Sequence, residues 1–244
     1  MIVIPMAGQS RRFAEAGYTV PKYKLTAHGR TLFAHAVSSF SECFQSLPFL
    51  FVCRDIADTP AFIEAQCREL GVRSFQCVAL AAPTGGQAET VALGLERCGC
   101  ADDEPVTIFN IDTFRRGFHF PAVVEADGYL EVFRGGGDNW SYVRPLAPGS
   151  DRVSETAEKR AISDLCCTGL YHFRSAGLYQ SAYRAFVHSQ DMRGDLKELY
   201  VAPIYNILIR RGADIRYHLI PAEDVTFCGV PAEYEAFRAV NKND

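Results

Sequence analysis

Residues 1–25, MIVIPMAGQSRRFAEAGYTVPKYKL, join a short apolar run to a small-residue turn and a set of cationic side chains. The run Met1–Met6 has the length and composition of a buried strand. The turn Ala7–Ser10 follows at once, then two arginines, and Lys22 comes ten residues after the second of them. A turn after a strand leaves backbone N–H groups to face a ligand, and the cations make that ligand an anion. The stretch therefore predicts a phosphate-binding loop.

The order of residues from Pro5 to Phe13, Pro-Met-Ala-Gly-Gln-Ser-Arg-Arg-Phe, followed by Pro-Lys, resembles the signature of sugar-phosphate nucleotidyltransferases. That signature reads Ala-Gly-x-Gly-x-Arg-Phe and then Pro-Lys, and Ser10 stands at its second glycine. The resemblance implies that Arg12 and Lys22 are catalytic. It also implies that the nucleotide is bound by a run of five residues: Ala7, Gly8, Gln9, Ser10 and Arg11.

The chain has 244 residues, 48% of them hydrophobic, which is enough for one α/β domain with a sizeable core. The formal net charge of −4, with cations gathered near the N-terminus, argues against nucleic-acid binding and favours a small anionic ligand. The opening apolar run is too short for a secretory signal core or a membrane span, so we expect a cytoplasmic protein without membrane contact.

The first half alternates short apolar runs with helical patterns. Strands are predicted at Met1–Met6, Pro48–Cys53, Ser74–Ala79 and Val106–Ile111, and helices at Thr31–Phe44, Pro60–Leu70 and Gln87–Arg97. This alternation predicts crossover units and a parallel sheet covered on both faces. Together with the resemblance, it implies a three-layer, Rossmann-like α/β fold of the GT-A type with a mixed, mostly parallel sheet.

The second half is richer in strands. These are predicted at Gly128–Arg134, Trp140–Pro145, Cys166–Phe173 and Asp214–Ile220, with helices at Ser175–His188, at Leu196–Arg210 and from Pro231. We interpret residues 1–244 as a single nucleotidyltransferase domain. Residues 1–125 form its NTP-binding half and residues 126–244 its acceptor-binding half.

Asp112 is the candidate metal ligand. It follows the predicted strand Val106–Ile111, and the carboxyl end of a buried parallel strand opens toward the ligand crevice. A carboxylate beside a polyphosphate is repulsive unless a divalent cation lies between them. Such an aspartate alone is as often a turn or cap residue, but the resembling family binds its metal at this place. We therefore expect Asp112 to bind Mg²⁺.

A glycine-bearing loop precedes the helix predicted at Gln87–Arg97. Two glycines permit close backbone approach to a flat ligand, and the resembling family reads the nucleobase with a comparable loop. The residues in question are Gly85, Gly86 and Gln87. The alternative is a plain loop in which Gln87 only caps the helix.

The resemblance extends to a Glu-Lys pair that precedes a Gly-x-Tyr-x-Phe strand. In the family this pair holds the acceptor, the lysine its phosphate and the glutamate its hydroxyls, which implies acceptor binding by Glu158, Lys159 and Gly169. The alternative is an ordinary surface ion pair of little energetic value. Trp140, the single tryptophan, either lines this site or packs in the core.

The segment Asp224–Pro231 departs from the family pattern. The family's closing motif often reads Asp-x-Gly-Thr, and its aspartate is a second metal ligand in many members. Here Phe227 stands at that position. Either Asp224 replaces the acid through a shift of the chain, or the metal relies on nucleotide oxygens and water, which Mg²⁺ tolerates.

The resemblance implies an enzyme that joins an NTP to a phosphorylated acceptor. The opening Ile-Pro-Met-Ala-Gly, with Ala16-Gly17-Tyr18, is similar to nucleotidyltransferases of capsule and surface-polysaccharide pathways. We expect the acceptor to be a sugar 1-phosphate and the products an NDP-sugar for capsule or surface polysaccharide, plus pyrophosphate. A non-sugar phosphorylated acceptor with a cytidylyltransferase activity is the alternative, and the sequence does not specify the base. A homodimer is the default expectation for oligomeric state.

Two rival classes share some of these features. A GT-A-type glycosyltransferase would carry an Asp-x-Asp motif, whereas Asn110-Ile111-Asp112 supplies one acid, and it has no use for the N-terminal cations. A non-catalytic nucleotide-binding module is favoured only by the missing acid at Phe227. Pyrophosphate release with an NTP and a phosphorylated acceptor separates the three.

Overall fold

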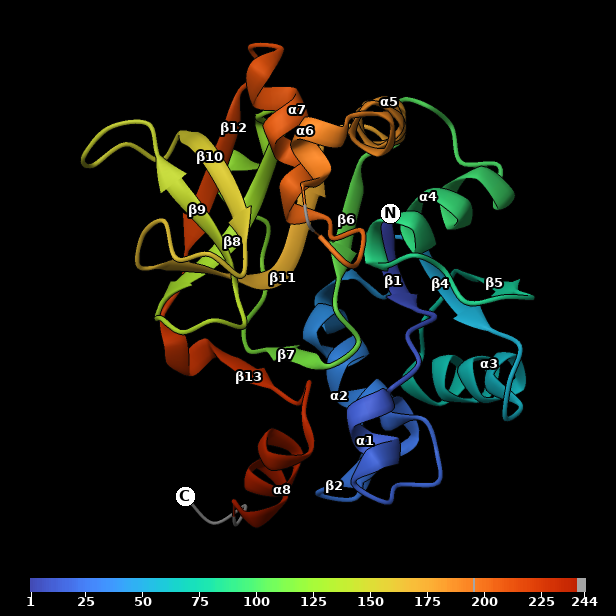
Figure 1. Cartoon of the computed structure of the whole chain (residues 1–244). Coiled ribbons are helices and arrows are strands. Elements are labelled where there is room, and N and C mark those ends of the chain that lie inside the picture. Colours follow the sequence, from blue (N-terminus) through green and yellow to red (C-terminus); the bar gives the residue numbers. More distant parts are fainter. Residues whose placement is uncertain (195, 241–244) are drawn as a thin grey trace.

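The computed structural model describes residues 1–194 and 196–240. In these ranges nine strands form one sheet (Figure 1). Its main order is β10 (Val153–Glu158), β9 (Ser141–Pro145), β11 (Leu165–Phe173), β6 (Val106–Phe109), β1 (Ile2–Met6), β4 (Phe49–Arg54) and β5 (Phe75–Leu80). Off this path, β8 pairs with β11 and with β12; the two strands are Gly128–Arg134 and Ile215–Leu219.

The sheet is mixed. Strands β6, β1, β4 and β5 run parallel to one another, and β12 runs parallel to β8. Strand β11 is antiparallel to both β6 and β8. Because β6 belongs to the predicted NTP half and β11 to the acceptor half, both halves contribute to one sheet. Residues 241–244 of the predicted domain lie outside the described residues.

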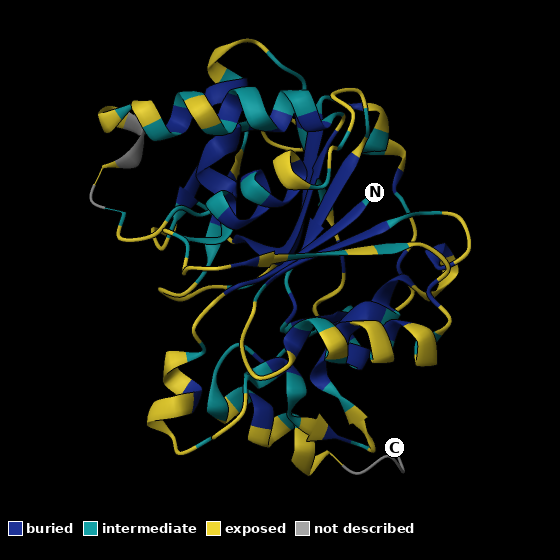
Figure 2. Ribbon diagram, turned by 90° about the vertical axis from the view of Figure 1, so that its right-hand side faces the viewer, coloured by how far each residue is buried: buried dark blue, intermediate teal, exposed yellow. Residues whose placement is uncertain are grey.

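Helices cover both faces of the sheet, and Figure 2 shows the buried strands between two helical layers. One layer contains α1 (Arg11–Glu15), α2 (Leu32–Val37), η2 (Ser38–Cys43), α3 (Thr59–Leu70) and α8 (Pro231–Ala239). The other contains α4 (Gln87–Arg97), α5 (Ala176–His188) and α7 (Tyr205–Arg210), with α6 (Gln190–Arg193) following α5. The predicted three-layer α/β fold is confirmed.

The alternation of side chains along β1 explains the two cores. Ile2 and Ile4 belong to the core under α2 and α3, whereas Val3 belongs to the core under α4 and α5. All three residues have no exposed surface. A strand that is apolar at every position is what a sheet buried on both faces requires.

Short elements complete the chain. Two ribbons pair β2 with β3 and β7 with β13; their strands are Thr26–Ala27, Arg30–Thr31, Thr113–Arg115 and Val225–Phe227. Four further 3-10 helices are η1 (Lys22–Lys24), η3 (Ala122–Glu125), η4 (Ala202–Ile204) and η5 (Ala222–Asp224). The β7–β13 ribbon brings the C-terminal segment to the residues that follow β6. No helix in the described ranges has the length and hydropathy of a membrane span.

The prediction of one helix over Leu196–Arg210 is wrong in its first part. Helical structure begins only at η4, and residues 196–201 form an irregular segment with bends. The backbone of Leu199 explains the difference, because its N–H donates to Gly85 O and its carbonyl accepts from Ala88 N, both at 2.8 Å. These bonds replace the bonds that a helix would make within itself.

Two strand predictions also differ from the structure. Strand β6 ends at Phe109 rather than at Ile111, although Asn110 N still donates to Gly169 O of the neighbouring strand β11 at 3.2 Å. Strand β10, which the predictions missed, has a mostly polar sequence and lies at the edge of the sheet.

Candidate functional site

The predicted phosphate loop lies at the carboxyl end of β1. Ala7 is buried, whereas Gly8 and Gln9 are exposed. Ser10 adopts a left-handed conformation (φ 51°, ψ 34°) and begins α1. Within the described residues, no backbone carbonyl accepts from the N–H groups of Gly8, Gln9 or Ser10. The loop therefore presents backbone donors that an anion can use.

The two arginines of α1 differ in their contacts. Arg11 Nε donates to Gln9 Oε1 at 3.0 Å, which holds this guanidinium beside the loop. Arg12 is exposed, and its guanidinium forms no ion pair with any residue that the structure describes. Arg12 is thus available to an anion from outside the chain.

Lys22 and Asp112 contact each other near the carboxyl end of β6. Lys22 lies on η1, Asp112 lies in the turn after β6, and Lys22 Nζ forms an ion pair with Asp112 Oδ2. Each side chain is 20% exposed, so the pair is open to a ligand. The backbone fixes Asp112 as well, because its carbonyl accepts from Cys228 N at 2.8 Å. The structure therefore brings together the predicted signature lysine and the predicted metal ligand.

Lys24, the other lysine of η1, has contacts of its own. Its Nζ donates to the carbonyl of Ala57 and lies 4.8 Å from the centre of the Phe62 ring. These contacts tie η1 to the start of α3, so Lys24 has a structural role.

The glycine loop before α4 packs against the irregular segment 196–201. A Cβ on Gly86 (φ 150°) would lie 2.4 Å from Leu199 N, so only glycine fits there. Gln87 Nε2 donates to Asn110 Oδ1. Asn110 in turn lies against Gly169 (φ 98°), where a Cβ would be 2.4 Å from Asn110 Nδ2. The loop is therefore connected through Asn110 to both β6 and β11.

Of the predicted acceptor residues, Glu158 and Lys159 lie at the end of β10, whereas Gly169 lies within β11. Glu158 is held by the hydroxyl of Ser141, and its side chain is only 4% exposed. Burial raises the pKa of the Glu158 carboxyl. Lys159 Nζ lies 4.0 Å from Glu158 Oε1 and donates to Tyr200 Oη at 2.6 Å. The hydrogen bond to Tyr200 raises the pKa of the Lys159 ammonium.

Phe227, which stands where the family's closing motif often has an acid, packs against other aromatic rings. Its ring packs edge-on against Trp140, with centroids 4.6 Å apart, and also contacts Phe133. Trp140 therefore packs in a small aromatic cluster. Asp224 does not replace the missing acid, because it pairs with Arg115 Nη1 at 3.4 Å on the far part of the β7–β13 ribbon.

The residues around Asp112 can accommodate a metal ion, although the described residues contain no group of three potential ligands. The ammonium of Lys22 already occupies a cation position on the carboxylate. Gly229 leaves space beside it, because a Cβ there would lie 3.3 Å from Asp112 Oδ2. One carboxylate combined with phosphate oxygens and waters is a donor set that suits Mg²⁺.

Four residues of the site were missed by sequence reasoning. Asn110, Ser141 and Tyr200 contact predicted site residues only through the tertiary fold. Glu233 accepts from Gly229 N at 2.8 Å and from Val230 N at 3.2 Å, and so shapes the turn beside Asp112. Because Val230 stands at the cap position where the capping-box pattern has Ser or Thr, the sequence carries no such signal for Glu233.

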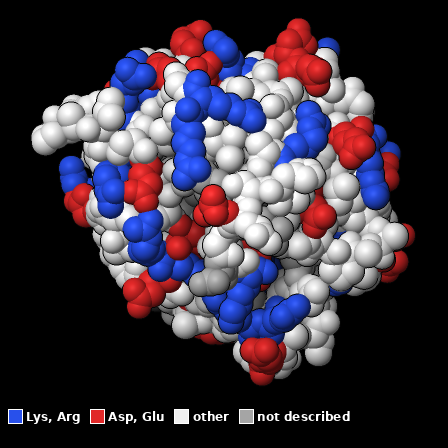
Figure 3. Space-filling view, turned by 45° about the horizontal axis from the view of Figure 1, so that its top comes forward, with Lys and Arg blue, Asp and Glu red and all other residues white. Residues whose placement is uncertain are grey.

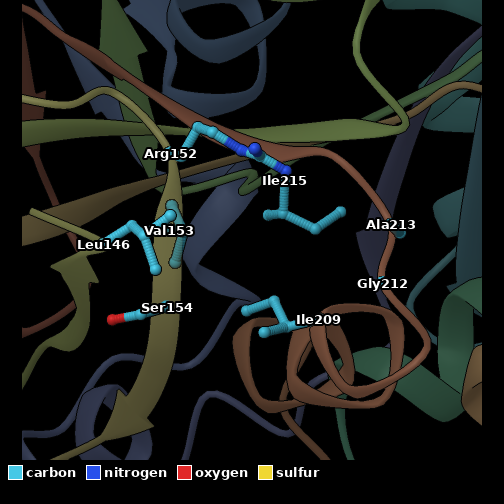
Figure 4. A pocket seen from close by; sticks show the side chains of 8 residues that line it. All are labelled: Leu146, Arg152, Val153, Ser154, Ile209, Gly212, Ala213 and Ile215. Atoms are coloured by element: carbon cyan, nitrogen blue, oxygen red, sulfur yellow. The ribbon is translucent and has the colours of Figure 1, made fainter.

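The distribution of surface charges and the position of one pocket are two further observations. Acidic and basic side chains alternate across the face shown in Figure 3, unlike the continuous basic surface of a nucleic-acid-binding protein. Figure 4 shows a pocket between β10, α7 and β12 that contains none of the predicted site residues. It is lined by Leu146, Arg152, Val153, Ser154, Ile209, Gly212, Ala213 and Ile215.

The chain is similar to solved structures of enzymes that handle nucleotides. It matches the nucleoside-diphosphate-sugar pyrophosphorylase from Vibrio cholerae RC9 with a TM-score of 0.95 and 52% identity, over 98% of this chain and 100% of that one. An inositol-1-phosphate CTP transferase from T. maritima (TM-score 0.73, 16% identity, 99% and 96% covered) shares the fold. A UTP-bound UGPase from Acinetobacter baumannii also shares the fold, with a TM-score of 0.68 and 12% identity over 97% of this chain and 91% of that one. No protein-family model and no curated protein sequence matches the chain.

Proposed function

Because this chain is a nucleotidyltransferase that belongs to the nucleoside-diphosphate-sugar pyrophosphorylase family, we propose that it joins an NTP to a sugar 1-phosphate. The products are an NDP-sugar and pyrophosphate. The observation that carries the proposal is the Lys22–Asp112 ion pair, in which Lys22 lies on η1 and Asp112 follows the carboxyl end of β6, the neighbour of β1. The donors of the phosphate loop follow the same end of β1.

The N-terminal loop binds the polyphosphate in this proposal. The N–H groups of Gly8–Arg11 and the exposed guanidinium of Arg12 hold the β- and γ-phosphates, as backbone donors and arginines do elsewhere. Gly85, Gly86 and Gln87 lie at the start of α4 and contact the base. The amide of Gln87 is held by Asn110, which supports an oriented side chain at this position.

Lys22 stabilises charge at the reacting phosphorus. An oxygen of the acceptor phosphate attacks the α-phosphorus, and the bond between that phosphorus and the oxygen of the β-phosphate breaks. Since the acceptor phosphate is already an anion, no side chain has to remove a proton. Catalysis then depends on in-line positioning and on a cation beside the developing charge.

Asp112 would hold Mg²⁺ in this scheme. When bound, the ion would neutralise phosphate charge and act as a Lewis acid. In the free protein Lys22 balances the charge of Asp112. When the nucleotide enters, the ammonium of Lys22 would turn to the α-phosphate, and the carboxylate of Asp112 would then be free to hold the ion.

The acceptor lies toward the end of β10. Lys159 binds its phosphate, Glu158 accepts from its hydroxyl groups, and Gly169 keeps the neighbouring backbone close to Asn110. Burial of Glu158 supports this role, since a buried carboxylate needs hydroxyl donors. The resemblance of the opening motif to enzymes of capsule pathways supports surface polysaccharide as the destination of the product.

The test is a pyrophosphate-release screen with Mg²⁺. ATP, CTP, GTP, UTP and dTTP are each combined with glucose 1-phosphate, mannose 1-phosphate and, as non-sugar acceptors, inositol 1-phosphate and phosphocholine. We expect release only when an NTP and a sugar 1-phosphate are both present. Release with a non-sugar acceptor alone would change the acceptor class, and no release with any pair would overturn the proposal.

A further inference from the structure

We propose that Tyr200 is a positioning residue for the acceptor phosphate, acting through Lys159. The proposal rests on the proposed function, because it takes Lys159 as the phosphate-binding cation. Its own support is a set of contacts that the irregular segment 196–201 makes with two parts of the site.

Tyr200 is the hydrogen-bond partner that fixes the end of the Lys159 side chain. Lys159 Nζ donates to Tyr200 Oη at 2.6 Å and lies 4.8 Å from the centre of the Tyr200 ring. The Lys159 side chain is 45% exposed, so without this partner its long chain would sample many rotamers. An ammonium has three N–H groups, which leaves donors for a phosphate.

The backbone of Lys159 is fixed as well. Its φ of 53° is a left-handed conformation that is uncommon for a residue with a side chain. Lys159 N donates to Trp140 O at 2.9 Å, which holds this turn against the neighbouring strand. The remaining conformational freedom of Lys159 therefore lies in its side chain, whose ammonium group is bound by Tyr200.

The segment that carries Tyr200 is held at both ends. On one side Leu199 makes its two backbone hydrogen bonds to Gly85 and Ala88. On the other side Ala202 O accepts from Thr156 Oγ1 at 2.7 Å, and Thr156 belongs to β10, as does Glu158. The Tyr200 hydroxyl is thus positioned relative to both the glycine loop and the acceptor strand.

The experiment measures KM and kcat of Tyr200→Phe, which keeps the ring and removes the hydroxyl. The acceptor is glucose 1-phosphate, or the sugar 1-phosphate that gives the fastest pyrophosphate release. We expect the acceptor KM to rise about tenfold, the loss typical of one hydrogen bond to a charged group, while kcat and the NTP KM stay within about twofold. Tyr217→Phe on β12 is the matched control and keeps wild-type values.

A double-mutant cycle then tests whether Tyr200 acts through Lys159. In a Lys159→Ala background, Tyr200→Phe should change the acceptor KM no further. An unchanged acceptor KM in Tyr200→Phe, or an additive effect in the double variant, would overturn this proposal alone. A wild-type protein that releases no pyrophosphate with any pair would overturn the proposed function, and this proposal with it.

Discussion

Lys22 and Asp112, ninety positions apart in the sequence, form a mostly buried ion pair just beyond the carboxyl end of β6. The pair balances the charge of the carboxylate in the free protein. Both groups are only 20% exposed, so solvent screens them less than it would a surface pair. This contact places the lysine predicted to be catalytic beside the aspartate predicted to bind the metal.

Lys22→Ala tests the catalytic part of this arrangement. Loss of a charge-stabilising donor costs about 3 kcal/mol in the transition state, so we expect turnover to fall roughly a hundredfold or more. The measurement is steady-state pyrophosphate release, with a thermal melt to show that the fold survives. Lys24→Ala, which removes a lysine of the same 3-10 helix outside the site, should stay close to wild type. Near-normal turnover in Lys22→Ala would remove Lys22 from the mechanism.

A second prediction concerns metal binding by Lys22→Ala in the absence of substrate. If Lys22 occupies the cation position on Asp112 in the free protein, its removal frees that carboxylate for a divalent ion. We therefore expect Lys22→Ala to bind Mn²⁺ more tightly than wild type in the absence of nucleotide, as measured by electron paramagnetic resonance titration. Equal or weaker Mn²⁺ binding in the variant would contradict the exchange of Lys22 for a metal.

Asp112→Asn should abolish the response of pyrophosphate release to Mg²⁺. The amide keeps the shape of the side chain and removes the charge that attracts the ion. The measurement is a Mg²⁺ titration of the initial rate. Asp224→Asn is the control, because Asp224 pairs with Arg115 and does not contact Asp112. A Mg²⁺ curve for Asp112→Asn that overlays the wild-type curve would exclude Asp112 as a ligand.

We expect the free energy of unfolding to fall in acid because of His172. Burial lowers the pKa of its imidazole from 6.5 to about 4, and Nδ1 is hydrogen-bonded to Thr107 Oγ1 at 2.9 Å. The unfolded chain takes up the proton first as the pH falls. The stability from neutral His172 is therefore complete above pH 6.5 and is lost as the pH falls toward 4, by about 3 kcal/mol.

The check is the free energy of unfolding in urea at several pH values, for wild type and for His172→Asn. The asparagine keeps a polar atom near Thr107 and does not titrate. We expect the variant to lose less stability than wild type between pH 6.5 and 4. Parallel curves for the two proteins would mean that another group causes the acid sensitivity.

Local patterns predicted much of the fold. Helix α4 has its predicted bounds because its apolar residues repeat at helical spacing, and β8 has its bounds because it is a buried run. The segment 196–201 was mispredicted because its backbone hydrogen bonds go to Gly85 and Ala88, which are distant in sequence. Strand β10 was missed because an edge strand needs few apolar residues.

The candidate site, like the fold, could be predicted from the sequence only in part. The resemblance gave roles to Lys22, Asp112 and Lys159 because their motifs are local. The partner of Lys159 could not be predicted, because Tyr200 reaches it from a segment 41 positions away. Phe227 is a further case, since its aromatic neighbours become visible only in the folded structure.

The most direct test of the central claim is a ³¹P nuclear magnetic resonance time course with the NTP, the sugar 1-phosphate and Mg²⁺. The account predicts that the triphosphate and sugar-phosphate signals decay together, while a pair of diphosphate-ester signals and the pyrophosphate signal grow in equal amounts. Lys22→Ala should slow all of these changes to the same degree. Formation of a nucleoside diphosphate and inorganic phosphate, or a triphosphate that stays unchanged beside the sugar phosphate, would contradict the account.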